Sequence, residues 1–327
     1  METLTKLNHM LEKCMPFMSS ASLVLGVVFA GSLGGFLFLP PWIFAFMTFA
    51  GSLNCGFGDL RNVACHPKPL LIILLLLHVW MPILACAAGH LFFSESYLTA
   101  GMIMEFAVPT GILSLVWVTI YGGNVALTLS VIMLDTVLAP FILPLTLKIL
   151  AGASVQVGVW DMMRGMLLMV AIPALAAMAL HDLTKKKLSS WLSPRLSPFS
   201  KLAVIPVVAI NSTKLAPFFH DVQPVYVSLA AVIFFLALSG YIWAALAARL
   251  FRQNEENMVS IFFNASMRNI SAGAVIAVQF FPAETVFPVM IGTLFQQVLA
   301  AFGGIYLNRR KSRRNLGEKV ELPPPIL

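Results

Sequence analysis

Charged side chains are scarce in this sequence. Only 11% of its 327 residues are Asp, Glu, Lys or Arg, 59% are hydrophobic, and the mean hydropathy is +0.88. A water-soluble domain carries about 25% charged residues, so this composition excludes one. The chain is predicted to be an integral membrane protein.

Cysteine and the common catalytic motifs are also sparse. The four cysteines show neither CxxC nor paired metal-ligand spacing and are interpreted as buried thiols. The sequence contains no HExxH, no GxSxG, no Walker loop and no aspartate-rich metal pair. These absences argue against an enzyme, an ATP-driven pump and a resident metal or cofactor.

Apolar runs replace the short alternating segments that would indicate a membrane barrel. Runs of roughly 17 to 25 residues are long enough to cross a bilayer as helices, and the chain has about ten of them. The predicted fold is therefore all-α and polytopic, with ten transmembrane helices. The runs lie near residues 16–37, 40–57, 69–93, 97–121, 123–150, 157–181, 200–219, 224–250, 257–281 and 285–307.

The net charge of +7 does not indicate a nucleic-acid partner, because the basic residues follow the predicted topology. With ten crossings, all but Lys148, Lys214, Arg164 and Arg268 of the 21 basic residues lie on one side. Lys and Arg concentrate on the cytoplasmic side of membrane proteins, so both termini are expected there. The basic segment 181–201 is predicted to be a cytoplasmic loop.

The predicted helices divide into two groups of five near residue 152. Because five is odd, the two groups must enter the membrane in opposite orientations, as in inverted-repeat transporters. The expected organisation is a first repeat over 1–152, a second over 153–310 and a cytoplasmic tail over 311–327.

Polar and helix-weakening residues interrupt the fourth helix of each predicted repeat. EFAVPTGILSL (105–115) contains a proline and a glycine, and NASMRNISAG (264–273) contains an arginine and two asparagines. Substrate sites of inverted-repeat transporters lie at such interruptions. Each stretch could instead be a kinked packing helix, an alternative that is weaker for the second stretch because a charge at this depth is unfavourable. The candidate substrate-binding residues are Thr110, Ser114, Arg268, Asn269 and Ser271.

Arg268 needs a partner or a water-filled cavity at this depth. Glu105 and Asp135 are the acids that lie well inside predicted spans, and either could form an ion pair with it. Alternatively, its guanidinium could bind a carboxylate or sulfate beside the N-terminus of a half-helix, and the two roles are compatible. His78 is interpreted as a hydrogen-bonded packing residue.

Three stretches resemble the bile acid:sodium symporter family. They are GDLRNVACHPKP (58–69), VPTGILSLVWVTIYGGNVALTLSVIMLDTVLAPFILPL (108–145) and SMRNISAGAVIA (266–277). The resemblance implies a ten-helix secondary transporter of organic anions. It also implies that helices four and nine unwind and cross at mid-membrane, with two sodium ions supporting the crossover and the substrate nearby.

The sodium-ligand positions implied by the resemblance are only partly kept. Ser114 and Thr128 match hydroxyl ligands of the first ion. Asn264 occupies the position of the acidic residue that both ions share. Backbone carbonyls of Ala265 and Met267 could still serve the second ion. The other ligand positions hold Leu77, Leu115, Ile132 and Arg268.

These replacements argue against sodium coupling, since leucine and isoleucine offer no oxygen and an arginine repels a cation. Arg268 is hypothesised to be a tethered cation in the place of a transported one. Proton coupling through Asp135 or Glu105, or uncoupled facilitation, is the alternative.

The predicted function is alternating-access transport of a small organic anion, such as a bile acid-like or pantoate-like carboxylate or a sulfate. The predicted location is a bacterial inner membrane. The alternative is a transporter-derived sensor or scaffold that binds its ligand without moving it.

Overall fold

The computed structural model describes residues 2–58, 67–152, 158–221 and 223–318. Most of the family-like stretch 58–69, residues 59–66, therefore lies outside the described residues. Every secondary-structure element within these ranges is a helix, which confirms the all-α prediction.

The first part of the chain, up to residue 150, forms helices of very unequal length. They are α1 (Glu2–Val28), α2 (Ala30–Leu33), η1 (Gly34–Phe36), α3 (Pro40–Ser52), α5 (Pro67–Leu75), η3 (Leu76–Trp80), α6 (Met81–Phe92), α7 (Ser96–Ala107), α8 (Leu113–Ile120) and α9 (Val125–Leu150).

The second part has the same mixture of long and short helices. They are α10 (Val159–Met166), η5 (Leu167–Ala171), α11 (Ile172–Leu183), α12 (Lys187–Leu202), α13 (Val204–Ser212), η6 (Thr213–Leu215), α14 (Ala216–His220), α15 (Pro224–Leu250), α16 (Glu255–Asn264), α17 (Ile270–Phe280) and α18 (Ala283–Glu318).

Several helices are long and apolar enough to cross a membrane. Six uninterrupted helical segments meet this description among the described residues, and a bent pair over Phe17–Val28 and Ala30–Phe36 makes up to seven. Their lengths fit the bilayer core at 1.5 Å per residue. The chain is thus a multi-pass helical protein, while the count of ten crossings stays a prediction.

The segment 187–202 is a helix and not the predicted loop. Its two internal prolines, Pro194 and Pro198, weaken helix hydrogen bonding, and its polar residues suggested a connection. However, α12 packs against α1 and α3, and Ser189, Ser193 and Pro198 are buried. Tertiary packing here outweighs local propensity.

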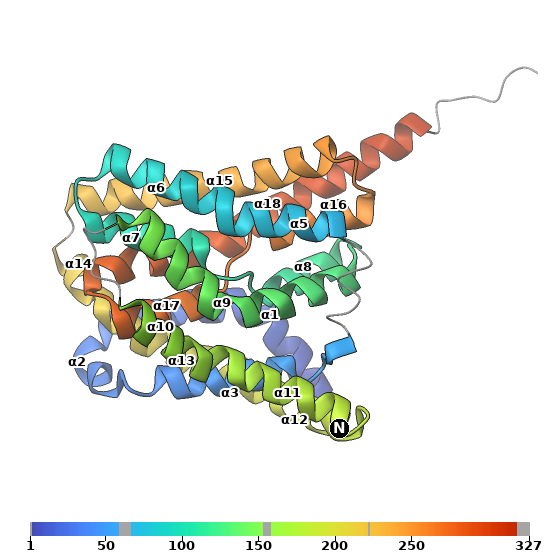
Figure 1. The fold of residues 1–327 in the computed structure, drawn as a ribbon, viewed down its shortest axis with the longest axis horizontal. Helices are drawn as coiled ribbons and strands as arrows, with labels where there is room; N and C mark the ends of the chain where they lie inside the picture. Colours follow the sequence, from blue (N-terminus) through green and yellow to red (C-terminus); the bar gives the residue numbers. More distant parts are fainter. Residues whose placement is uncertain (1, 59–66, 153–157, 222, 319–327) are drawn as a thin grey trace, which may run out of the picture.

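Two groups of helices face each other across the middle of the molecule (Figure 1). One contains α1, α3 and α10 to α13, where α1 packs on α12 and α13, and α3 packs on α11 and α12. The other contains α5, α6, α15 and α18. Helices α7, α9 and α17 lie between them, and α17 contacts α3 and α13 on one side and α7 and α18 on the other. Helix α16 packs on α15 and α5.

A π-helical turn, η3, separates α5 from α6 and precedes Pro82. Proline has no N–H and its ring clashes with the carbonyl four residues earlier in an α-helix. A wider π turn at that place relieves the clash, and such turns are frequent at functional sites. This turn contains His78.

Both predicted interruptions are confirmed. Between α7 and α8, residues 108–112 leave the helical path, and between α16 and α17, residues 265–269 do the same. The two breaks meet in an antiparallel bridge between Thr110 and Arg268. Two broken helices therefore cross inside the protein.

Candidate functional site

Backbone hydrogen bonds join the two breaks. Asn269 N donates to Pro109 O at 2.8 Å, and Gly111 N donates to Met267 O at 3.3 Å. The Thr110 hydroxyl donates to Asn264 O at 2.9 Å and Met267 O at 3.2 Å. Polar backbone that leaves a helix inside a membrane must find partners within the protein, and each break supplies them to the other.

Gly111 permits this close approach. A methyl group at its Cα would lie 2.8 Å from the carbonyl oxygen of Arg268. Real side-chain carbons do not approach a backbone oxygen so closely without a shift, so the crossing distance depends on this glycine.

The Arg268 side chain lies at the C-terminal ends of two half-helices. Its Nε donates to Phe106 O, in the last turn of α7, at 3.2 Å, and its Nη1 donates to Ala265 O, at the C-cap of α16, at 2.9 Å. Both ends carry unpaired carbonyls and the negative end of a helix dipole. The guanidinium satisfies both, and Arg268 is only 3% exposed.

The expected direct ion pair between Arg268 and an acid is not formed. Within the described part of the chain, neither Glu105 nor Asp135 makes a salt bridge to it, although both interact with its charge at longer range. The physical reason is geometric: the carbonyls of the broken helices lie closer to the guanidinium than either carboxylate does. The prediction of a direct Arg268 pair therefore requires correction.

Asp135 instead pairs with His78. Its Oδ1 lies 2.5 Å from His78 Nε2, and its Oδ2 accepts the backbone N–H of Thr110 at 2.6 Å. Asp135 is fully buried and comes from the middle of α9. One carboxylate thus links the π turn η3 to the break between α7 and α8.

Glu105, the second predicted coupling acid, lies in the last turn of α7 and is 4% exposed. Its Oε2 is buried without a hydrogen-bond partner among the described residues. Gly292 of α18 has no side chain, and the Glu105 carboxyl group occupies the space that a side chain would fill.

Asn264 connects the hydroxyl groups that the resemblance assigns to the first sodium site. Its Oδ1 accepts from Ser114 Oγ at 2.9 Å, and its Nδ2 donates to Thr128 Oγ1 at 2.9 Å and Ser260 O at 2.8 Å. A cation at this place would need free oxygens, but the Asn264 amide is hydrogen-bonded to both hydroxyl groups. All three side chains in this network are fully buried.

The other replaced ligand positions add no oxygen. Leu77 is fully buried in an apolar cluster, and Leu115 and Ile132 present only carbon. No group of three or more His, Cys, Asp or Glu side chains able to hold a metal ion occurs among residues that the structure describes.

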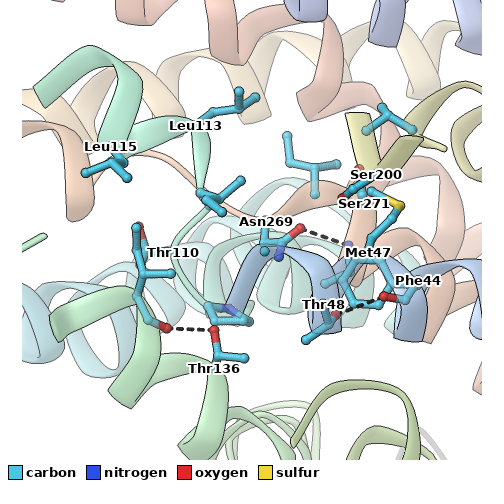
Figure 2. A pocket seen from close by; sticks show the side chains of 18 of the residues that line it. Phe44, Met47, Thr48, Thr110, Leu113, Leu115, Thr136, Ser200, Asn269 and Ser271 are labelled. Atoms are coloured by element: carbon cyan, nitrogen blue, oxygen red, sulfur yellow. Dashed lines mark hydrogen bonds between the residues drawn. The ribbon is translucent and has the colours of Figure 1, made fainter. Parts of the chain in front are cut away.

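A cavity of about 320 Å³ lies between the crossover and helices α1, α3 and α12. Figure 2 shows Leu113 and Leu115 on one side and Met47 and Thr48 on another. Its lining includes two basic residues, Arg268 and Lys201, and no described Asp or Glu. Hydroxyl and amide groups also border it: Thr48, Thr136, Ser193, Ser197, Ser200, Thr293, Gln296 and Gln297.

The predicted substrate residues divide into two sets. Asn269 and Ser271 are half-buried and border the cavity, at the N-terminus of α17. Thr110 and Arg268 also border the cavity, but their polar groups donate hydrogen bonds to carbonyls of the crossover. Ser114 is fully buried against Asn264 and does not line the cavity.

Sequence reasoning missed the polar wall that α12 supplies. The cavity is lined by Ser193, Ser197, Ser200 and Lys201, whereas the prolines and serines of this segment predict a loop. The serines recur at three- and four-residue intervals, which is the signal of one helix face. The partner of His78 had no such signal, because Asp135 is 57 residues away.

Comparisons with known proteins agree with this geometry. The family model described as "Sodium Bile acid symporter family" matches residues 40–216. The Bacillus subtilis (strain 168) protein named "Uncharacterized protein YbaS" is 47% identical over 296 residues, which cover 90% of this chain and 97% of that protein.

Two further relatives carry transporter names. "Uncharacterized sodium-dependent transporter YocS" of B. subtilis (strain 168) is 22% identical over 90% of this chain and 92% of its own length. "Probable sodium/metabolite cotransporter BASS1, chloroplastic" of Arabidopsis thaliana is 28% identical over 85% of this chain and 69% of its own length. With broken helices that cross in a multi-pass helical fold, the chain belongs to the sodium bile acid symporter family.

Proposed function

We propose that this protein is a secondary transporter that moves a small organic anion by alternating access without requiring sodium. The observation that carries the proposal is the crossover. There, N–H groups of Arg268 and Asn264 occupy oxygens that the resemblance assigns to two sodium ions. The transporter class is that of the family, whereas the substrate and the coupling ion are the proposed parts.

Electrostatics of the cavity support an anionic substrate. Two basic residues and no described acid border it, so a carboxylate or sulfate would meet favourable charge from Arg268 and Lys201. Asn269 and Ser271 add polar groups at the N-terminus of α17, where the helix dipole favours negative charge. The apolar side chains of Met47, Leu113 and Leu115 suit the hydrocarbon part of a bile acid-like or pantoate-like molecule.

A sodium ion would meet repulsion at the second site. Two unit charges about 4 Å apart interact by about 4 kcal/mol at an effective dielectric constant of 20. The Arg268 guanidinium already donates to Ala265 O, the carbonyl that would otherwise coordinate the ion. The names of YocS and BASS1 mention sodium for those proteins. We propose that this chain has exchanged the mobile cation for a tethered one.

The proposed topology has ten crossings. It counts the bent segment from α1 to η1, helix α3, and the broken pairs α7–α8 and α16–α17 beside the six uninterrupted spans. Each break then falls in the fourth crossing of a five-helix repeat, 1–152 or 153–310. Both termini, including the tail 311–327, would lie in the cytoplasm of a bacterial cell, with the protein in the inner membrane.

Exchange measured in proteoliposomes tests the proposal against the sensor or scaffold alternative. Purified protein is first screened by thermal shift with pantoate, taurocholate and an aromatic sulfate. The compound that gives the largest shift is then loaded inside vesicles, and uptake of its labelled form is followed. Labelled uptake well above that of protein-free vesicles supports transport. A thermal shift without uptake would favour the sensor and contradict the proposal.

A further inference from the structure

The His78 and Asp135 pair is built differently from an ordinary packing contact. The two polar atoms are 2.5 Å apart, and the side chains are 8% and 0% exposed. His78 Nδ1 is buried and has no hydrogen-bond partner among the described residues. A buried histidine with only a packing role normally has hydrogen-bond partners for both ring nitrogens, and His78 has one for Nε2 alone.

The pair is connected to the part of the protein that must move. Asp135 Oδ2 holds the N–H of Thr110, and the Thr110 hydroxyl holds Asn264 O and Met267 O of the other broken helix. A change of charge on the Asp135 carboxylate therefore changes the strength of a bond at the crossing point. Glu105 lacks this connection, because it lies within regular helix α7.

Charge balance at the crossover calls for one proton. The buried ionisable groups are Arg268, Asp135, Glu105 and His78, with Tyr241 of α15 neutral. With both acids ionised and His78 neutral, these groups carry one excess negative charge. An uncompensated buried charge is costly, and a single proton on Glu105 or on the His78 and Asp135 pair removes it. The link to Thr110 distinguishes the pair from Glu105.

We propose that the His78 and Asp135 pair binds the proton that drives anion transport. This inference rests on the proposed function, whose missing coupling ion it supplies. In the deprotonated state the carboxylate holds Thr110 N–H firmly. A shared proton draws charge from the carboxylate, weakens that bond and frees the crossover to rearrange while the anion is bound. The proton and one monovalent anion then cross together, without net charge movement.

Other charged groups on the neighbouring helices lie away from the pair. The elements packed against α9 and η3 carry them in their first or last turns: Lys68, His90, Lys148, Asp161, Arg164, His181, Asp182, Arg249, Glu255 and Glu256. Arg268, Glu105 and Tyr241 are the ones near the crossover. Arg268, whose charge interacts with both Asp135 and Glu105, is therefore the group whose charge acts most directly on the pair.

The test measures accumulation of pantoate, or of whichever screened anion exchanges, in proteoliposomes containing choline in place of sodium. The membrane potential is clamped at zero with potassium and valinomycin. An inward proton gradient of about one pH unit is worth 1.36 kcal/mol and can sustain about tenfold accumulation for one proton per anion. Asp135→Asn keeps the shape and an acceptor for Thr110 N–H, and His78→Gln serves as a second variant. The control is Asp221→Asn, at an exposed acid bonded to Gln223.

The wild type and Asp221→Asn are expected to accumulate the anion up to tenfold, and Asp135→Asn and His78→Gln to stay near onefold while still exchanging label at a reduced rate. Gradient-driven accumulation by both pair variants equal to the wild type, or its loss in Glu105→Gln alone, would overturn this inference. So would wild-type uptake in choline that stops at onefold whether or not the pH gradient is applied. Strict dependence of wild-type transport on sodium would instead overturn the proposed function.

Discussion

Nη1 of Arg268 donates a hydrogen bond to the carbonyl oxygen of Ala265 at 2.9 Å. The donor and the acceptor are only three residues apart, and both lie in the break between α16 and α17. Through Nε the same side chain reaches Phe106 O, on the other broken helix. One guanidinium thereby holds two helix C-termini together, as a bound cation could.

Restoring the family's ligands should restore a cation site. We expect the triple substitution Leu77→Gln, Asn264→Glu and Arg268→Gln to gain stabilisation by sodium, because it removes the tethered charge and returns side-chain oxygens to three ligand positions. A ligand that binds only the folded state stabilises it by about 2.7 kcal/mol at a hundredfold excess over Kd. Thermal unfolding in sodium and in choline measures the gain, and the wild type serves as the control. Identical unfolding of the triple variant in the two salts would show that the replaced positions are not the ion ligands.

The close approach of the two breaks makes Gly111 sensitive to substitution. Gly111→Ala should lower the free energy of unfolding by about 1 to 3 kcal/mol, the usual cost of overpacking. The added methyl would meet the Arg268 carbonyl at 2.8 Å. Gly34→Ala is the matched control, since an added methyl there would have no neighbouring atom within 4 Å and the backbone is right-handed helical. Equal stability of the two variants in detergent unfolding would contradict the crossing geometry.

Two carbonyls of the opposite break share the single Thr110 hydroxyl proton, and Thr110→Val leaves Asn264 O without this donor while Met267 O keeps the Gly111 N–H. Each buried acceptor left unpaired costs about 1 to 3 kcal/mol. The variant should unfold at a lower temperature and transport more slowly, even though its shape is nearly unchanged. Thr119→Val removes an exposed hydroxyl bonded within its own helix and should have little effect. A stable, fully active Thr110→Val would exclude this support.

Lys201 tests the contribution of α12 to anion binding. It lines the cavity and donates to Asn8 Oδ1 at 2.6 Å. Lys201→Gln removes positive charge but keeps a donor, and we expect anion affinity to fall by about fivefold, which corresponds to about 1 kcal/mol. Titration by calorimetry measures it, with Lys148→Gln, near the end of α9, as the control. Unchanged affinity would place the anion away from this wall.

Much of the fold was predictable because a bilayer imposes strong rules. Long apolar runs predicted helices, and proline, glycine and asparagine predicted both breaks. These signals are local, so a single sequence displays them. The helix over 187–202 was not predictable in this way, because its prolines and serines favour a loop and only packing on α1 and α3 stabilises it.

The candidate site was predictable in its members but not in its pairings. The sequence indicates four members of the site: Arg268, Asn264, Thr128 and Asp135. It does not indicate that Arg268 donates to backbone carbonyls or that Asp135 pairs with His78. Partners of a buried charge depend on which backbone groups a break leaves free and on how the helices turn toward each other. Neither property is visible in residue spacing.

Sodium dependence of exchange by the wild-type protein tests the central claim most directly. The initial rate of labelled anion exchange is measured in proteoliposomes at one fixed pH, with sodium and then with choline as the only added cation. We expect equal rates within error, because Arg268 and Asn264 occupy the two sodium sites that the family resemblance implies. A rate that vanishes in choline and rises with sodium to saturation would contradict it.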